Sequence, residues 1–441
     1  MWDDSAQSQS TLEAKLKALQ CHFTWNIEHN SKFYRIKDKL KDIGTDEGNS
    51  WLGHIYNLQG YIHYQLKLKK DALCFLKKAT EAFRQSKVSD EGPWLVVNYG
   101  NLTWLHHKLG EEAESQTYLS KVDTLLKEYS SPSQDELHPE IYAEKAWTLM
   151  KINQDKNELA ADYFQRAIRM QPDMVEWHTS YVIGLVKAHK YGETPLEEEI
   201  LEKMRMAKER DPENLYLAAL ELEQRALREE RIEDEARELA RLILRNPVSS
   251  YSGIKVLLWV YSEHISVDEA IALAEEALEK YPDVRYLKWC AALCYKWKIL
   301  PDRHSHESTI HRAVNLHKEV ISLYPNPSSS LVKKIALANL YAKSRDGLAK
   351  AEQTYQELLA TKLELAERQM LYSYYAKYLY FNRKDNRKSI EYYMKVAKIP
   401  LDNYFQRKSI EALENFKDRN PGSPMVREIE KFLDKLRLQK S

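Results

Sequence analysis

The sequence predicts an all-α protein built as a solenoid of repeated helix pairs, and three observations support this fold class. The chain of 441 residues has only 12 Gly and 14 Pro, with 30% charged and 43% hydrophobic residues. This composition is typical of long amphipathic helices joined by tight turns. A pattern of small, aromatic and small residues followed by proline recurs, and Pro212, Pro247 and Pro282 fall 35 residues apart. That spacing is close to the roughly 34-residue period of tetratricopeptide repeats.

The recurring pattern matches the second helix of a tetratricopeptide unit. Its clearest copy has spacings of four, three and five residues: Ala160, Phe164, Ala167 and Pro172. A second copy has alanine in place of the aromatic residue: Ala270, Ala274, Ala277 and Pro282. Small residues let helices approach closely, the aromatic ring fills the remaining gap, and proline ends the helix. We expect about eight to nine helix pairs whose first helices line a concave basic groove or tunnel.

Two insertions and one softer boundary divide this array. Polar, turn-rich stretches at 187–197 and 298–310 lengthen two units, and the segment 129–133 separates the second unit from the third. We divide the chain into N-terminal repeats (1–130), central repeats (131–330) and C-terminal repeats with terminal helices (331–441). Residues 409–441 lack a recognisable final helix pair of the usual kind.

Charge and composition limit the classes of function. Lys plus Arg and Asp plus Glu both number 66, so no global field attracts polyanions, and a nucleic-acid site must be a local basic pocket. Four cysteines without paired spacing indicate buried free thiols in a reducing compartment. No targeting segment or apolar stretch long enough for a membrane is found, so we expect a cytosolic protein that does not bind membranes.

The sequence lacks the motifs of common enzymes. It has no Gly-rich phosphate loop, metal-binding HExxH helix or nucleophile elbow, and no pair of carboxylates stands out, so we expect no catalysis. His304, His306 and His311 with Asp302 could form a metal cluster, but their polar loop lacks rigid spacing and favours solvated histidines. We therefore expect neither a metal nor a cofactor.

An aromatic residue and a lysine share one helical face in the third unit. Trp147 and Lys151 are four residues apart, and Ile183 and Lys187 repeat the apolar-basic spacing in the next unit. A ring beside an ammonium group can stack on a base while the charge holds a phosphate. Lys255, followed by Lys288 and Lys296, extends this predicted basic stripe. Solvated lysines on an ordinary helix face are the alternative.

Several segments resemble the interferon-induced proteins with tetratricopeptide repeats. The residues Cys21-His22-Phe23-Thr24-Trp25 match a hallmark of that family, and the segments 99–104 and 293–296 are also similar to it. The similarity runs along nearly the whole chain. It implies a cytosolic antiviral effector that grips the triphosphate or cap at the 5′ end of single-stranded RNA in a positive tunnel and blocks translation of foreign RNA.

The resemblance also implies RNA-contacting residues. The family's cap-stacking tryptophan falls on Trp147 and a triphosphate-binding lysine on Lys151. Lys187 and Lys255 replace arginines, and Tyr191 replaces a phenylalanine. Four further positions line the RNA or cap pocket in the family: Glu176, Ile183, Asn214 and Tyr216.

At other positions the chain departs from the family. Lys39 and Ile43 replace a threonine and a glutamine near the 5′ phosphates, and Asn157 replaces a phosphate-side tyrosine. Trp289-Cys290 replaces a histidine-glutamine pair along the RNA path. Lys39 could add a phosphate contact, so these changes leave the preferred 5′ end open.

Two other functions compete with RNA-end binding. A tetratricopeptide groove commonly holds peptides or partner helices, so a protein-interaction scaffold is the main alternative. A ribonuclease is a third reading. Pairing with copies of itself or with family members is compatible with the first two, and no DNA partner is expected.

Overall fold

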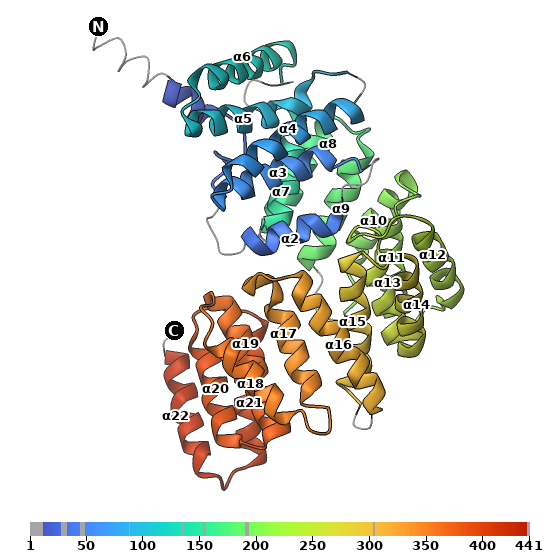
Figure 1. Ribbon diagram of the computed structural model, residues 1–441, viewed down its shortest axis with the longest axis vertical. Helices are drawn as coiled ribbons and strands as arrows, with labels where there is room; N and C mark the ends of the chain where they lie inside the picture. Colours follow the sequence, from blue (N-terminus) through green and yellow to red (C-terminus); the bar gives the residue numbers. More distant parts are fainter. Residues whose placement is uncertain are drawn as a thin grey trace, which may run out of the picture. The chain divides into compact units, whose positions relative to one another are not determined.

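The computed structural model describes residues 12–27, 33–44, 49–87, 89–131, 133, 136–152, 156–189, 194–302 and 305–438. Within these ranges the regular structure is helical, without strands (Figure 1). The chain divides into two compact units, unit 1 (Met1–Ile265) and unit 2 (Ser266–Ser441).

Unit 1 is a stack of helix pairs preceded by a helical segment over 12–18. Neighbouring pairs along the chain pack against one another. Its elements are α2 (Phe33–Ile43), α3 (Leu52–Gln65), α4 (Lys69–Ser86), η1 (Pro93–Leu95), α5 (Val96–Leu109), α6 (Glu112–Glu128), α7 (Pro139–Ile152), α8 (Asn157–Met170), α9 (Val175–His189), α10 (Glu198–Arg210), α11 (Leu215–Leu227), α12 (Glu233–Arg245), α13 (Ile254–Val260) and η3 (Tyr261–Ile265).

Unit 2 repeats the same construction. Its elements are α14 (Val267–Lys280), α15 (Arg285–Ile299), α16 (Glu307–Leu323), α17 (Pro327–Tyr341), α18 (Leu348–Leu359), α19 (Leu365–Tyr378), η4 (Leu379–Arg383), α20 (Asn386–Lys398), α21 (Tyr404–Arg419) and α22 (Pro424–Leu438). In the described residues, five successive pairs from α3 to α12 and four from α15 to α22 pack together. The predicted solenoid of about eight to nine pairs is confirmed.

The repeat pattern packs as its residue types predict. Ala160, Phe164 and Ala167 of α8 are all 0% exposed, and α8 ends at Met170, two residues before Pro172. The helices α10, α12 and α14 likewise end one or two residues before their prolines. A proline just beyond each helix is expected, because it can neither donate to the helix nor continue it.

The end of the chain forms one more helix pair. Residues 409–441 do contribute to a helix pair, α21 and α22, which pack together around Leu413, Phe416, Ile429 and Leu433. These buried residues follow helical spacing but lack the alanine-aromatic-alanine pattern, so the repeat search missed them. The division at residues 130 and 330 stays a prediction, because it groups repeats by role rather than by compactness.

The segment containing Cys21 to Trp25 joins the start of the chain to two first helices. The backbone N–H of His22 donates to Oδ1 of Asn101 on α5 at 3.0 Å, and its Nε2 lies 3.0 Å from Oγ1 of Thr148 on α7. Gly100 lets this segment approach, since a Cβ there would lie 3.0 Å from that of Cys21. The segment from Cys21 to Trp25 therefore has a structural role: it ties the start of the chain to α5 and α7.

A chain of buried side chains connects α3, α4, α5 and α7. Asn57 donates to Glu144 at 2.8 Å, Asn98 donates to Asn57 at 2.7 Å, and Thr80 donates to Asn98 at 2.7 Å. Burial raises the pKa of Glu144 to about 8, although the hydrogen bond from Asn57 opposes this. Such networks favour one packing arrangement, because a buried polar group without a partner is destabilising.

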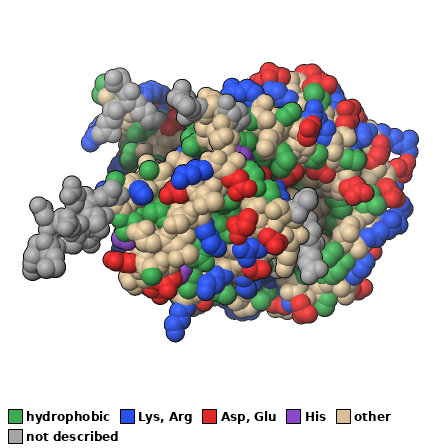
Figure 2. Space-filling view, turned by 90° about the horizontal axis from the view of Figure 1, so that it is seen from above, with side chains coloured by type: hydrophobic (Ala, Val, Ile, Leu, Met, Phe, Trp, Pro, Cys, Tyr) green, Lys and Arg blue, Asp and Glu red, His purple; other side chains and the backbone are tan. Residues whose placement is uncertain are grey.

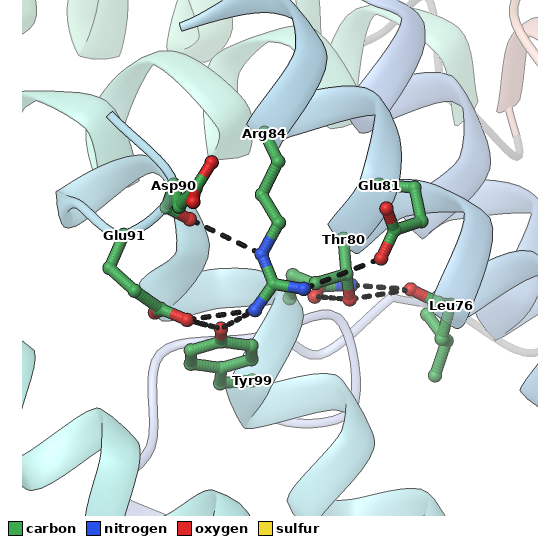
Figure 3. Close-up of polar contacts among 8 residues, drawn as sticks. Leu76, Thr80, Glu81, Arg84, Asp90, Glu91 and Tyr99 are labelled. Atoms are coloured by element: carbon green, nitrogen blue, oxygen red, sulfur yellow. Dashed lines mark hydrogen bonds and ion pairs between the residues drawn. The ribbon is translucent and has the colours of Figure 1, made fainter. Parts of the chain in front are cut away.

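The connection between α4 and α5 is fixed at its outer end. Figure 3 shows Arg84 donating to Glu91 at 2.9 Å and to the Asp90 carbonyl at 3.3 Å, while the Tyr99 hydroxyl donates to Glu91 at 2.7 Å. Elsewhere on the surface in view, acidic and basic side chains are interspersed (Figure 2). This mixture agrees with the zero net charge.

Candidate functional site

The residues that carry the candidate site come mainly from the first helices of successive pairs in unit 1. Trp147 and Lys151 lie on α7, Ile183 and Lys187 on α9, and Tyr216 on α11. First helices of neighbouring pairs pack side by side, and α7 contacts α9 directly. The fold therefore brings together side chains from three repeats.

Lys151 lies among aromatic rings. Its Nζ is 4.9 Å from the ring centroid of Trp147 and 4.7 Å from that of Tyr251. The described residues give it no hydrogen bond or ion pair. Burial lowers the pKa of Lys151 well below its usual range, and the charges of Lys187 and Lys39 lower it further.

Lys187 has a similar environment. Its Nζ lies 5.7 Å from the ring centroid of Tyr216, and no carboxylate pairs with it in the described part of the chain. Its side chain is exposed, yet desolvation by surrounding protein lowers its pKa to about 8. The side chain is therefore accessible to solvent, while the protein atoms around it destabilise its charged form.

Helix α2 closes unit 1 on itself near these lysines. The backbone N–H of Ser250, in the connection between α12 and α13, donates to the Asp42 carbonyl of α2 at 2.8 Å. Lys39 is exposed on the same helix, and its positive charge contributes to the lowered pKa of Lys151. We call Lys39, Lys151 and Lys187 the lysine cluster: three positive charges from α2, α7 and α9.

Trp147 is a core residue beneath this cluster. It is 1% exposed and stacks on Trp51, with ring centroids 5.7 Å apart and planes 14° apart. The His54 ring lies 6.3 Å away. The predicted pairing of Trp147 with Lys151 on one face is present, but the ammonium group covers the ring that was expected to stack on a base.

The other predicted residues of unit 1 surround the cluster to different degrees. Ile183 is half-buried against the hydrophobic core. Asn214 caps α11, with its Oδ1 accepting from the Leu217 N–H at 3.0 Å. Glu176 lies in the first turn of α9. Burial raises the pKa of Glu140, and the negative charge of Glu176 raises it further. Lys255 is exposed on α13, and no contact joins it to the cluster.

Two predicted residues lie elsewhere. Tyr191 is outside the described residues. Trp289 belongs to unit 2, where it packs against Lys333, whose Nζ is 4.8 Å from the ring centroid. Lys288, which was predicted to extend the basic stripe, also lies in unit 2. Its charge is neutralised by an ion pair with Glu319.

The departures from the family differ in burial. Ile43 is 5% exposed and packs in the core, so it presents an apolar surface where a polar group was expected. Asn157 is 2% exposed, and neither atom of its amide has a hydrogen-bond partner among the described residues. Cys290 is buried in unit 2.

Sequence reasoning missed two aromatic residues of the site. Tyr251 lies in the connection after Pro247, outside any repeat pattern, and Trp51 immediately precedes α3. Tyr251 contacts Lys151, and Trp51 stacks on Trp147, only through tertiary packing. No periodic signal identifies them, although the aromatic surplus of the chain, with 28 Tyr and 10 Trp, is consistent with such additions.

Within the described ranges, no three His, Cys, Asp or Glu side chains gather as metal ligands. His304 of the suspected cluster lies outside those ranges. Of the helices described, none is both long and apolar enough to cross a bilayer.

Comparisons with known proteins give consistent relatives, although no family model matches the chain. Mouse interferon-induced protein with tetratricopeptide repeats 2 is 27% identical over 429 residues, covering 93% of this chain and 88% of the relative. The human antiviral innate immune response effector IFIT1 is 27% identical, covering 90% of this chain and 86% of the relative.

Solved structures share the fold. The human IFIT1 dimer with PPP-AAAA superposes with a TM-score of 0.70 at 25% identity, covering 97% of this chain and 95% of that one. An IFIT1 monomeric mutant with Gppp-AAAA gives a TM-score of 0.74 at 22% identity, covering 97% and 100%.

Proposed function

We propose that this chain, which is similar over most of its length to the interferon-induced proteins with tetratricopeptide repeats, binds the 5′ end of single-stranded RNA through the lysine cluster. The bound end carries a triphosphate or a cap, as in the solved relatives with PPP-AAAA and Gppp-AAAA. The observation that carries the proposal is the gathering of Lys39, Lys151 and Lys187 within unit 1.

The electrostatics of the cluster favour a multiply charged anion. Lys151 and Lys187 have lost hydration without gaining a carboxylate among the described residues, so each charge is destabilised. Phosphate oxygens would supply the missing counter-charges. A peptide with isolated acidic side chains matches the desolvated ammonium groups of Lys151 and Lys187 less well than consecutive phosphates do.

The remaining site residues have supporting roles in this proposal. Trp147 and Tyr216 hold the lysine side chains, and Ile183 and Asn214 form the adjoining wall. Glu176 and Lys255, both in unit 1, are proposed contacts further along the RNA, whereas Tyr191 and Trp289 stay predictions from the resemblance. Because none of these groups matches a base edge in a fixed pattern, recognition is independent of sequence and needs a single-stranded end.

The consequence for the cell is antiviral. An occupied 5′ end excludes the factors that start translation, so foreign RNA is not translated. We propose that the protein acts in the cytoplasm by binding alone, without cleaving RNA, and does not bind DNA. The human relative forms a dimer, and we propose that this chain likewise associates with itself or with family members.

A binding series tests the proposal. Identical RNAs with 5′-hydroxyl, monophosphate and triphosphate ends are titrated with the full chain at two salt concentrations. Triphosphate RNA should bind at least about tenfold more tightly than hydroxyl RNA, which is about 1.4 kcal/mol. Three phosphate contacts predict that the logarithm of the binding constant falls with the logarithm of the salt concentration with a slope of about −2. Equal affinity for the hydroxyl and triphosphate ends excludes the proposal.

The same samples test the alternatives. In a pull-down, partner proteins that remain bound after nuclease treatment would favour a protein-interaction scaffold. That function also predicts that Lys151→Glu keeps the main activity of the protein. Shortened products after incubation with labelled RNA would indicate a ribonuclease.

A further inference from the structure

We propose that the lysine cluster selects RNA with a free 5′-triphosphate over RNA with a cap. This inference rests on the proposed function, since it presupposes that the cluster holds an RNA end. It adds the identity of that end, which the family resemblance leaves open.

The first argument is that Trp147 has no free ring face for a cap base. Recognition of a cap by stacking requires an accessible aromatic face, and Trp147 is 1% exposed. Trp51 stacks on it with planes 14° apart, and the Lys151 ammonium lies 4.9 Å from its ring centroid. A guanine could reach this ring only by displacing a packed tryptophan or a lysine.

The second argument concerns the two tyrosines nearby. The Lys151 ammonium lies 4.7 Å from the Tyr251 ring centroid, and the Lys187 ammonium lies 5.7 Å from that of Tyr216. The two rings are inclined by 50° with centroids 6.4 Å apart, so a flat base cannot lie against both. Each ring therefore serves as a support for an ammonium group.

The third argument is the charge of the two RNA ends. A terminal phosphate monoester carries about −1.5 to −2 charges at pH 7. In a capped RNA the same phosphorus is bridged to a nucleoside, so its second ionisable oxygen is lost. The ammonium groups of Lys151 and Lys187, which lie against the rings of Trp147, Tyr251 and Tyr216, gain from that extra charge, and the covered rings gain little from an added base.

The test uses one tetra-adenosine RNA with five 5′ ends: hydroxyl, monophosphate, triphosphate, unmethylated cap and methylated cap. Affinity for the full chain is measured by anisotropy of a 3′ label. The triphosphate end should bind at least about tenfold more tightly than either cap. Equal or tighter binding of a capped RNA overturns the inference while preserving 5′-end binding, and equal affinity for all five ends overturns both.

Two variants examine the cause. Trp51→Leu uncovers a face of Trp147 and should tighten binding of capped RNA at least about threefold, with triphosphate affinity unchanged. An unchanged preference in folded Trp51→Leu contradicts the role of ring coverage. Lys151→Met should weaken triphosphate binding more than cap binding, and an equal loss for both contradicts the charge argument. Lys127→Met, an exposed lysine on α6 of the same unit, is the matched control and should change neither affinity.

Discussion

The Nζ of Lys151 lies 4.7 Å from the ring centroid of Tyr251, and this contact joins a first helix of the repeat array to the connection between α12 and α13. The aromatic surroundings stabilise an ammonium group only partly, because the ring quadrupole replaces little of the lost hydration. The site therefore holds charge that is unfavourable for folding and available for a ligand.

The first prediction follows from this cost. Lys151→Met keeps an unbranched side chain in the same packing and removes the desolvated amine. Its free energy of unfolding should rise by about 1–3 kcal/mol, while affinity for triphosphate RNA falls at least about tenfold. Urea unfolding and RNA titration measure the two effects. A loss of stability in this variant would contradict the assignment.

The second prediction concerns pH and Lys187. Its pKa of about 8 in the free protein means that the amine loses its proton as pH rises above that value. Phosphate favours the charged form, so bound RNA raises this pKa, and affinity should fall by up to about tenfold per pH unit above pH 8. Lys187→Arg stays protonated and should flatten the decline. A wild-type affinity independent of pH between 7 and 9.5 would refute the prediction.

The third prediction concerns the buried carboxyl of Glu144. Its folded pKa of about 8 lies above its ordinary value of 4.5, so between these values the folded state binds more protons than the unfolded state. Stability should therefore fall as pH rises from about 4.5 to about 8. Glu144→Gln keeps an acceptor for Asn57 and removes the titration. It should be more stable by about 2–4 kcal/mol near pH 7.5, with a flatter pH dependence in chemical denaturation.

The fourth prediction tests the closure of unit 1. Ser250→Pro removes the N–H that donates to the Asp42 carbonyl, whereas Ser250→Ala retains it. Amide exchange in α2 should become faster in the proline variant, and RNA affinity should fall several-fold as Lys39 loses its fixed position. The alanine variant should match the wild type in both measurements. Identical behaviour of the two variants would show that this bond does not hold α2.

The sequence predicted the features that repeat along the chain. Alanine spacing and proline positions identified the second helices, because close helix packing leaves little choice of residue there. The pairing of Trp147 with Lys151 was predictable for a similar reason, since residues four apart share a helical face. In both cases the information is local.

Features that depend on closure of unit 1 were not predictable. Tyr251 approaches Lys151, and Trp51 covers Trp147, only because separate parts of the chain meet. The stacking role assigned to Trp147 by resemblance stays a prediction for the same reason: residue identity at one position does not reveal which neighbour covers the ring. The α21–α22 pair was missed because its core uses Phe416 and Ile429 in place of the repeat's alanines.

The bond between Ser250 and Asp42 uses main-chain atoms on both sides. Its formation requires a backbone N–H at position 250, which every residue except proline supplies, so most substitutions at either position leave the bond intact. A comparison of aligned residues cannot register such a bond, whereas a comparison of backbone coordinates can. Closure in distant homologues is best traced by superposition, with the identity of these two residues disregarded.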